Sequence, residues 1–366
     1  MTFGSRARIR LGAIQHNLQS IRTGAPGARV MAVVKANAYG HGLVPVCRAL
    51  GDVDAVAVAR LAEARALRDA GVDTPVVLLG GVLSAADVEE ALALDVQLGI
   101  HHAQQLAWLE ARSSRAAFAW LKVDTGMHRL GVHPDEAVDA IARLRACAET
   151  IGLMTHFASA DDKDNPMTLQ QIERFLSLTE GFDGHVSIAN SAAVLGWGDP
   201  LEHLERFVQS GRLWIRPGLS LYGISPFPGS TGPELGLRPA MQFEAKLMSV
   251  KPIRAGSRVG YGGTWTATVD TVLGIIAVGY GDGYTRHIPS GAPVLVNDRR
   301  VQVAGRISMD LTAVDLGPDA RDEVGDPVVL WGDALPVEEI ADRADTIPYQ
   351  LVTGVSHREA PVYEDP

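Results

Sequence analysis

A single lysine ends the apolar run of residues 30–34, and small residues follow it directly in Ala-Asn-Ala-Tyr39-Gly-His-Gly. This pattern predicts a buried strand that delivers the amine of Lys35 to the mouth of a loop. Desolvation disfavours the ammonium form, so a lysine held beside apolar surface loses its charge easily. A neutral amine attacks a carbonyl carbon and forms a Schiff base, which makes Lys35 a candidate anchor for an aldehyde.

Polar side chains follow four later apolar runs in the same way. The residues concerned are Lys122, Asp124 and Arg129, then His156, then Asn190 and Ser191, and finally Arg216, Gly218 and Tyr222. Alone, each is readily explained as a strand end, a helix cap or a core side chain. If the runs are strands of one parallel barrel, their carboxyl ends meet at a single mouth, where reactive groups of such folds gather.

These residue types suit an aromatic aldehyde that carries a phosphate. Asn190-Ser191 opens a helical pattern, and the free N–H groups of a helix start favour phosphate. Gly218 lets the backbone approach the same phosphate closely. His156 is placed to face the ring. Arg216 stays protonated at working pH. Against a pyridine nitrogen it acts only as a donor, which weakens the ring as an electron sink and suits the transfer of one proton.

The elements that position these residues follow from the alternation of strand-like and helical patterns. The expected strands are 30–34, 54–59, 75–79, 95–99, 117–123, 151–155, 185–189 and 213–216, and the clearest helices between them are 60–70, 84–94, 102–112, 134–148 and 168–180. Eight strands separated by helices predict an α/β fold with an N-terminal (β/α)8 TIM-type barrel. An open doubly wound sheet is the alternative, but no G-x-G-x-x-G follows the first strand.

The composition of the sequence changes at residues 225–239, which are rich in proline, glycine and serine. The helical periodicity stops after this segment. The later runs 241–250, 272–279, 293–296, 301–304, 311–316 and 327–331 read as strands. We therefore expect a barrel domain over residues 1–232 and a mainly β C-terminal domain over 233–366. The first few residues of the chain are expected to pair with the second domain.

Composition excludes several classes of function. The chain has 366 residues, a formal net charge of −10 and no long basic block, which argues against nucleic acid or an anionic membrane as a partner. Cys47 and Cys147 are the two cysteines, and their spacing fits neither a zinc site nor a disulfide framework. No signal-peptide core and no membrane-length apolar stretch are seen. We expect a cytoplasmic protein without a metal site.

Taken together, the motifs are strongly similar to those of alanine racemases. The resemblance runs in order through both domains, in Ala-Val-Val-Lys35-Ala-Asn-Ala-Tyr39-Gly-His-Gly, Lys122-Val-Asp124-Thr-Gly-Met-His-Arg129-Leu-Gly, Ala-Asn190-Ser191-Ala-Ala, Arg216-Pro-Gly218-Leu-Ser-Leu-Tyr222-Gly, Val-Gly-Tyr261-Gly-Gly-Thr-Trp, Val-Gly-Tyr280-Gly-Asp-Gly, Gly-Arg306-Ile-Ser-Met309-Asp310 and Thr-Ile-Pro-Tyr349. The lysine motif alone is shared by other barrel proteins that bind pyridoxal phosphate, but the whole set is specific.

The resemblance implies a homodimeric enzyme that uses pyridoxal 5'-phosphate to interconvert L- and D-alanine and so supplies D-alanine for peptidoglycan. Two bases on opposite faces of the cofactor's aldimine would exchange the α-proton. Lys35 would be one base, and Tyr261, supplied by the second subunit, would be the other. Because a free tyrosine titrates near ~10, Tyr261 would need cationic or hydrogen-bonding neighbours.

The same resemblance assigns roles to the remaining residues. Tyr39, His156, Asn190, Ser191, Arg216, Gly218, Leu219 and Tyr349 would bind the cofactor; Arg129 and Met309 would bind the substrate carboxylate; Tyr280, Arg286 and Asp310 would line the substrate entrance. Lys122 matches a position that is carbamylated in several relatives, where the carbamate would hold Arg129 in place.

Three alternatives stay open at this point. A racemase of the same fold that prefers serine or several amino acids differs only in a small pocket, where discrimination is often ~1–3 kcal/mol. An amino-acid decarboxylase of the barrel type needs a protonated pyridine, which Arg216 argues against. A pyridoxal-phosphate homeostasis protein resembles the first domain alone, so residues 235–366 and Tyr261 argue against it.

Overall fold

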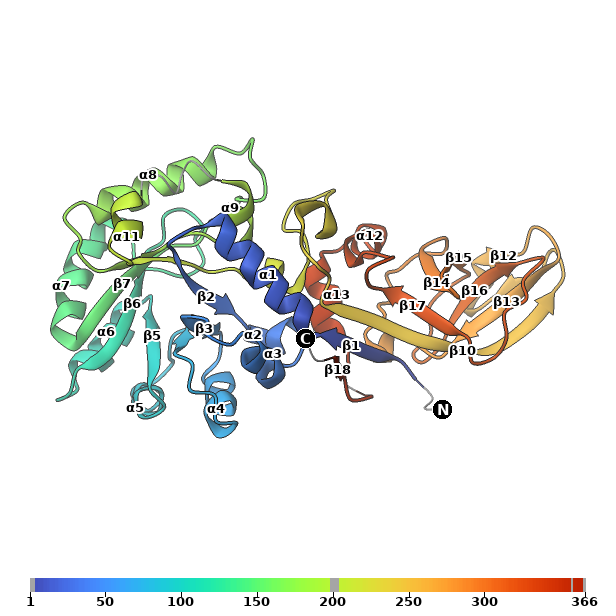
Figure 1. Cartoon of the computed structure of the whole chain (residues 1–366), viewed down its shortest axis with the longest axis horizontal. Coiled ribbons are helices and arrows are strands. Elements are labelled where there is room, and N and C mark those ends of the chain that lie inside the picture. The colour runs from blue at the N-terminus through green and yellow to red at the C-terminus, as the bar shows by residue number, and fades with distance from the viewer. Residues whose placement is uncertain (1–3, 198–203, 357, 365–366) are drawn as a thin grey trace.

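In the computed structural model, eight parallel strands close into a barrel at the N-terminal side of the molecule (Figure 1). The structure describes residues 4–197, 204–356 and 358–364. The barrel strands are β2 (Arg29–Val33), β3 (Ala55–Val58), β4 (Val76–Leu78), β5 (Val96–Ile100), β6 (Ala116–Lys122), β7 (Ala148–Met154), β8 (His185–Ser187) and β9 (Leu213–Ile215). Every one of them overlaps an expected strand region, although β7 begins three residues before its region, at Ala148, which was expected to end a helix.

Helices lie outside these strands. They are α1 (Leu11–Gly24), α3 (Leu43–Ala49), α4 (Leu61–Asp69), α5 (Ala85–Ala93), α6 (Ala103–Glu110), α7 (Ala137–Cys147), α8 (Met167–Thr179), α9 (Ser191–Gly196) and α11 (Glu205–Gln209). Helix α5 shows how local chemistry sets a start, since the Ser84 hydroxyl accepts a hydrogen bond from the Asp87 backbone N–H over 3.1 Å. No helix of the described residues has both the length and the apolarity needed to span a bilayer.

The barrel closes where its first strand meets its last. In the ladder between β2 and β9, Val30 is opposite Ile215, while on the other side of β2 Met31 is opposite Ala55 of β3. The strand residues are almost all buried, as expected when a parallel sheet is covered on both faces. The predicted (β/α)8 barrel is confirmed.

The C-terminal part is built on an eight-stranded sheet that extends away from the barrel (Figure 1). Its strands are β1 (Arg6–Arg10), β10 (Met241–Ile253), β13 (Thr271–Ile276), β14 (Pro293–Val296), β15 (Arg299–Val303), β16 (Thr312–Gly317), β17 (Pro327–Trp331) and β18 (Val362–Glu364), and a separate pair is formed by β11 (Arg258–Val259) and β12 (Trp265–Thr266). The pairings are antiparallel except that of β1 with β18, so the expected mainly β second domain is confirmed.

The start of the chain belongs to this second sheet rather than to the barrel. Strand β1 pairs antiparallel with β10 and parallel with β18. The guanidinium of Arg8 bridges the two neighbours, donating to Glu244 and to Glu364 over 2.9 Å each. Residues 1–3, which belong to the segment predicted to pair with this domain, lie outside the described residues.

Two helices interrupt the C-terminal domain where the sequence suggested that helical periodicity stops, and that expectation is wrong. They are α12 (Val337–Arg343) and α13 (Pro348–Gly354). Each has seven residues, too few for a clear 3.6-residue pattern. Helix α13 lies close against the segment after Lys35. A Cβ atom on Gly40 would lie only 2.1 Å from the carbonyl oxygen of Val352.

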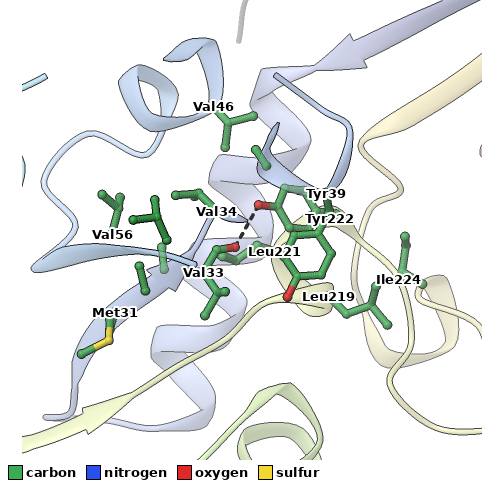
Figure 2. Packing of buried hydrophobic residues seen from close by; sticks show 14 of the residues in the cluster. Met31, Val33, Val34, Tyr39, Val46, Val56, Leu219, Leu221, Tyr222 and Ile224 are labelled. Carbon is green, nitrogen blue, oxygen red and sulfur yellow. Dashed lines mark hydrogen bonds between the residues drawn. The ribbon is translucent and has the colours of Figure 1, made fainter. Parts of the chain in front are cut away.

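Figure 2 shows buried side chains packed where the first barrel strand meets the segment after the last one, with Val46 of α3 and Val56 of β3 beside them. The hydroxyl of Tyr222 donates to the carbonyl oxygen of Val33 over 3.0 Å, and the Tyr39 and Tyr222 rings pack with centroids 4.9 Å apart. Both rings are buried. This packing holds the end of β2 and the segment that follows Lys35 in place.

Candidate active site

An open cavity of about 710 Å³ lies at the carboxyl end of the barrel strands. It is lined by eleven residues that the sequence marked as functional, namely Lys35, Tyr39, Lys122, Arg129, His156, Asn190, Ser191, Arg216, Gly218, Leu219 and Tyr349. They come from six separate parts of the chain. Barrel closure brings them together, and the loops that follow the strands carry most of them.

Lys35 begins α2 (Lys35–Tyr39), a short segment directly after β2. Its four residues after the lysine, Ala36 to Tyr39, all have φ between 52° and 55°. The side chain of Lys35 lines the cavity and is half-buried. Burial lowers the pKa of Lys35, and the nearby charge of Arg129 lowers it further, while Glu63 acts in the opposite direction. The amine is therefore easier to neutralise than a free lysine.

Arg216 lines the cavity and is buried. Its guanidinium donates to the Ser187 hydroxyl over 2.6 Å and to the carbonyl oxygen of Thr155. Burial lowers its pKa to about 10, which still leaves it protonated near neutral pH. Arg216 is thus a rigid, permanent donor.

A cluster of cations surrounds this donor. Lys122, at the end of β6, is buried, and its pKa is lowered to about 8 by burial and then by Arg216, Arg129 and Lys35. Burial and the same cations hold the pKa of His156 well below its ordinary value, so its ring is neutral. The four cations are Lys35, Lys122, Arg129 and Arg216. Within the described residues, none of them forms a salt bridge with a carboxylate. A mouth of this kind attracts anions.

Ser191 and Gly218 form another part of the cavity lining. The buried Ser191 hydroxyl accepts hydrogen bonds from the backbone N–H of Gly218 over 2.9 Å and of Ser220 over 3.3 Å. Asn190 caps the helix that Ser191 begins, accepting from the Ala193 N–H over 3.0 Å. A Cβ atom on Gly218 would lie 2.6 Å from the Tyr39 hydroxyl, so only glycine leaves this corner open.

Five residues that the sequence assigned to the site do not line this cavity: Tyr261, Tyr280, Arg286, Met309 and Asp310. They lie in loops of the C-terminal domain, and Tyr261 is 64% exposed. Tyr261 begins the turn η4 (Tyr261–Gly263) between β11 and β12. Strand β12 lies at the end of the molecule far from the barrel (Figure 1).

Two of those loops contact each other. The N–H of Tyr280 donates to the carbonyl oxygen of Ser308 over 3.0 Å, and the N–H of Gly281 donates to that of Met309 over 2.8 Å. Asp310 accepts a hydrogen bond from Arg358 over 2.7 Å. These loops therefore form one surface, and that surface lies outside the cavity of the same chain.

Sequence reasoning missed several residues that hold the site together. Gln171 of α8 is fully buried and donates to the Thr125 hydroxyl and to the carbonyl oxygen of His156, so it joins the loops after β6 and β7. Ser187 and Thr155 orient Arg216 as described above. The available signal was weak, since Thr155 and Ser187 are single polar residues in or at the end of apolar runs and Gln171 lies among other polar residues of α8.

The residues present fit pyridoxal phosphate. Lys35 offers an amine with a lowered pKa, Arg216 a buried donor for the ring nitrogen, and the open corner between Tyr39, Ser191 and Gly218 room for a phosphate. Within the described part of the chain, no cluster of three or more histidine, cysteine or acidic side chains is arranged to hold a metal ion.

Comparison with known families matches both halves of the chain. Residues 9–226 match the sequence model described as "Alanine racemase, N-terminal domain", and residues 240–363 match "Alanine racemase, C-terminal domain". The second match shows that the chain extends beyond the barrel of a single-domain pyridoxal-phosphate protein.

Individual relatives agree with the family models. The chain is 48% identical over 356 residues to the alanine racemase of Vibrio cholerae, covering 96% of each protein. It is 49% identical over 359 residues to that of Shewanella baltica, covering 97% of this chain and 98% of the relative. The crystal structure of the biosynthetic alanine racemase from Pseudomonas aeruginosa superposes with a TM-score of 0.91 at 39% identity, covering both chains completely.

Proposed function

This chain belongs to the alanine racemase family, and from that premise we propose which of its residues carry out the reaction. The family interconverts L- and D-alanine, depends on pyridoxal 5'-phosphate and supplies D-alanine for peptidoglycan, and this protein has that activity. When bound, the cofactor withdraws electrons from the α-carbon of the amino acid and so acidifies its α-hydrogen. The proposals concern what the side chains contribute.

We propose that Lys35 is the covalent anchor of the cofactor and one of the two bases. Its place at the end of β2 and its lowered pKa support this role. Once released from the cofactor, the neutral amine can take the α-proton on its own side or return one to the α-carbon. Tyr39, Asn190, Ser191, Gly218, Leu219 and Tyr349 would hold the phosphate end, and His156 and Arg216 the ring.

Arg216 supports racemisation over decarboxylation. A buried guanidinium with a pKa of about 10 cannot accept the proton of a pyridinium near neutral pH, so it keeps the ring nitrogen unprotonated. The electron sink is then weak, which favours a single reversible proton transfer. Arg129, exposed at the mouth, would bind the substrate carboxylate, and Lys122 would support it after reaction of its amine with carbon dioxide.

We infer that the second base is Tyr261 of the partner subunit. The carrying observation is that Tyr261 is largely exposed in a loop of the C-terminal domain and does not line the cavity of its own chain. A head-to-tail dimer would bring Met309 to the substrate carboxylate, and Tyr280, Arg286 and Asp310 to the entrance. We also propose that the barrel domain covers residues 1–232 and the C-terminal domain residues 233–366, and that the protein is cytoplasmic.

Subunit complementation tests this arrangement. Lys35→Ala and Tyr261→Ala homodimers should each be inactive, because every site lacks one base. Mixed and allowed to exchange subunits, they form heterodimers in which one site has both bases, so activity should return. If mixing restored nothing while native mass spectrometry showed heterodimers, the shared site would be wrong. Parallel assays with L-alanine and L-serine measure the preference between the two substrates.

A further inference from the structure

The segment directly after Lys35 has a backbone conformation that needs outside support. Ala36, Asn37, Ala38 and Tyr39 all lie in the left-handed region, with φ between 52° and 55°. L-residues other than glycine adopt this region at a cost, and four in succession are exceptional. Such a turn persists only where its surroundings hold it.

Part of that support comes from the segment itself. The N–H of Ala38 donates to the carbonyl oxygen of Val34 over 2.8 Å, and the Asn37 side chain accepts from the N–H of Leu43 over 2.8 Å. These bonds hold the end of the turn that is remote from Lys35. Neither of them involves the N–H of Ala36, the residue next to the lysine.

The partner of this N–H group is Glu63, which lies in the first turn of α4. One carboxylate oxygen accepts from the Ala36 N–H over 2.6 Å. The other accepts from the N–H groups of Ala59, over 2.9 Å, and of Arg60, over 3.1 Å. One half-buried carboxylate therefore ties the junction of β3 and α4 to the first residue after Lys35.

The same carboxylate affects the charge of the lysine. The charged and titratable groups that face the Lys35 amine are Arg129 and Lys122 from β6 and its loop, His156 from the loop after β7, and Glu63 from α4. Glu63 is the anion of this set. It raises the pKa of Lys35, against the effects of burial and of Arg129.

We propose that Glu63 is a positioning residue for Lys35, which holds the left-handed turn so that the amine points into the cavity. This inference rests on the proposed role of Lys35 as the anchor. Glu63 would touch neither cofactor nor substrate, and it would act through the backbone of Ala36.

The next βα unit offers a matched control. Asp87 occupies the corresponding place in the first turn of α5 and is also half-buried. Its side chain accepts from the N–H of Leu83 over 2.9 Å, so it supports the start of its own helix. No bond from Asp87 to another βα loop is seen among the described residues. Asp87→Asn therefore measures the loss of local capping without the link to the lysine turn.

The experiment follows the capture of pyridoxal phosphate by the apoprotein, as the rise of absorbance near ~420 nm across a series of pH values. Borohydride reduction and peptide mapping then identify the modified lysine. Glu63→Gln removes the charge and one of the two acceptor oxygens, while Glu63→Asp keeps the charge but shortens the reach to Ala36. Lys35→Ala tests the anchor itself.

We expect the capture rate at its high-pH plateau to fall about tenfold or more in both Glu63 variants, because the neutral amine is no longer held toward the cavity. The pH midpoint should move to lower pH in Glu63→Gln and stay in place in Glu63→Asp. Asp87→Asn should change neither quantity. Hydrogen exchange should quicken at residues 36–40 in the Glu63 variants alone.

Plateau rates of the Glu63 variants within twofold of that of Asp87→Asn would overturn the proposal, and Glu63→Asp alone decides this if Glu63→Gln does not fold. A lower plateau shared by Asp87→Asn would overturn it as well. Failure of the anchor looks different, because capture would then persist in Lys35→Ala and peptide mapping would find another lysine.

Discussion

A Cβ atom placed on Gly218 would lie 2.6 Å from the hydroxyl oxygen of Tyr39. The two residues come from opposite ends of the barrel sequence, one after β2 and the other after β9. Their contact exists because those two strands are neighbours. The open corner that results is the feature of the cavity that best suits a phosphate.

Gly218→Ala should weaken retention of pyridoxal phosphate. The φ of Gly218 is −124°, outside the left-handed region, so the effect would come from the contact with Tyr39. We expect a stability loss of about 1–3 kcal/mol from overpacking, with a higher dissociation constant for the cofactor. Thermal unfolding and absorbance titration measure the two. Gly354→Ala is the control, since its Cβ would meet nothing within 4 Å; equal effects in both variants would contradict this prediction.

Ser187→Ala should destabilise the protein through Arg216. The fully buried Ser187 hydroxyl accepts from the guanidinium over 2.6 Å and donates to the carbonyl oxygen of Trp214 over 2.9 Å. Without it, one N–H group of the buried guanidinium loses its acceptor, while the bond to Thr155 remains, at a cost of about 1–3 kcal/mol in urea unfolding. The exposed Ser177→Ala should change stability by less than about 0.5 kcal/mol. A Ser187→Ala value that small would mean that Arg216 finds another acceptor.

Stability of the apoprotein should rise with pH above 8 because of Lys122. Its pKa is about 8 in the folded protein against an ordinary value of 10.5. Between these values the unfolded chain binds more protons than the folded one, so the free energy of unfolding increases with pH. The gain is on the order of 1–3 kcal/mol.

Urea unfolding in carbon-dioxide-free buffer at several pH values measures this gain, because carbon dioxide would react with the free amine. The Lys122→Met variant should lack it. Lys251→Met, at an exposed position of β10, should follow the wild type. If the free energy of unfolding changed with pH in the same way in the wild type and in Lys122→Met, the Lys122 amine would have the same protonation in the folded and unfolded states.

Arg258→Met should slow racemisation without unfolding the protein. The guanidinium of Arg258 donates to the carbonyl oxygens of Gly263 over 3.0 Å and of Gly262 over 3.2 Å, which holds the turn that begins at Tyr261. Loss of this clamp should lower kcat about tenfold, because the proposed base is no longer held in place. Since Arg258 is exposed, stability should change by less than about 0.5 kcal/mol.

Arg254→Met provides the comparison for that experiment. Arg254 lies close by in the chain, is exposed, and pairs with Asp270 over 2.7 Å without contacting the tyrosine turn. Its kcat should equal that of the wild type. An unchanged kcat in Arg258→Met would show that the hydrogen bonds of Arg258 are not needed to hold Tyr261 in place.

The strands were predictable because their signal is local. A strand in a covered parallel sheet is apolar along nearly its whole length, and residues 30–34 and 55–59 show this directly. The helices α12 and α13 escaped prediction because seven residues give too short a periodic pattern. The left-handed turn after Lys35 escaped it too, since Ala36 and Ala38 are not residues that mark such a conformation.

The sequence by itself determined which side chains carry reactive groups and which runs become strands, since both depend on residue type and short-range pattern. The tertiary structure alone decided which of them meet. Glu63 reaches Ala36 across 27 positions, and Gly218 reaches Tyr39, because barrel closure and strand register set those distances. The same packing keeps Tyr261 out of the cavity that Lys35 of its own chain lines. Distances between remote segments depend on how whole elements pack, and no local pattern encodes that.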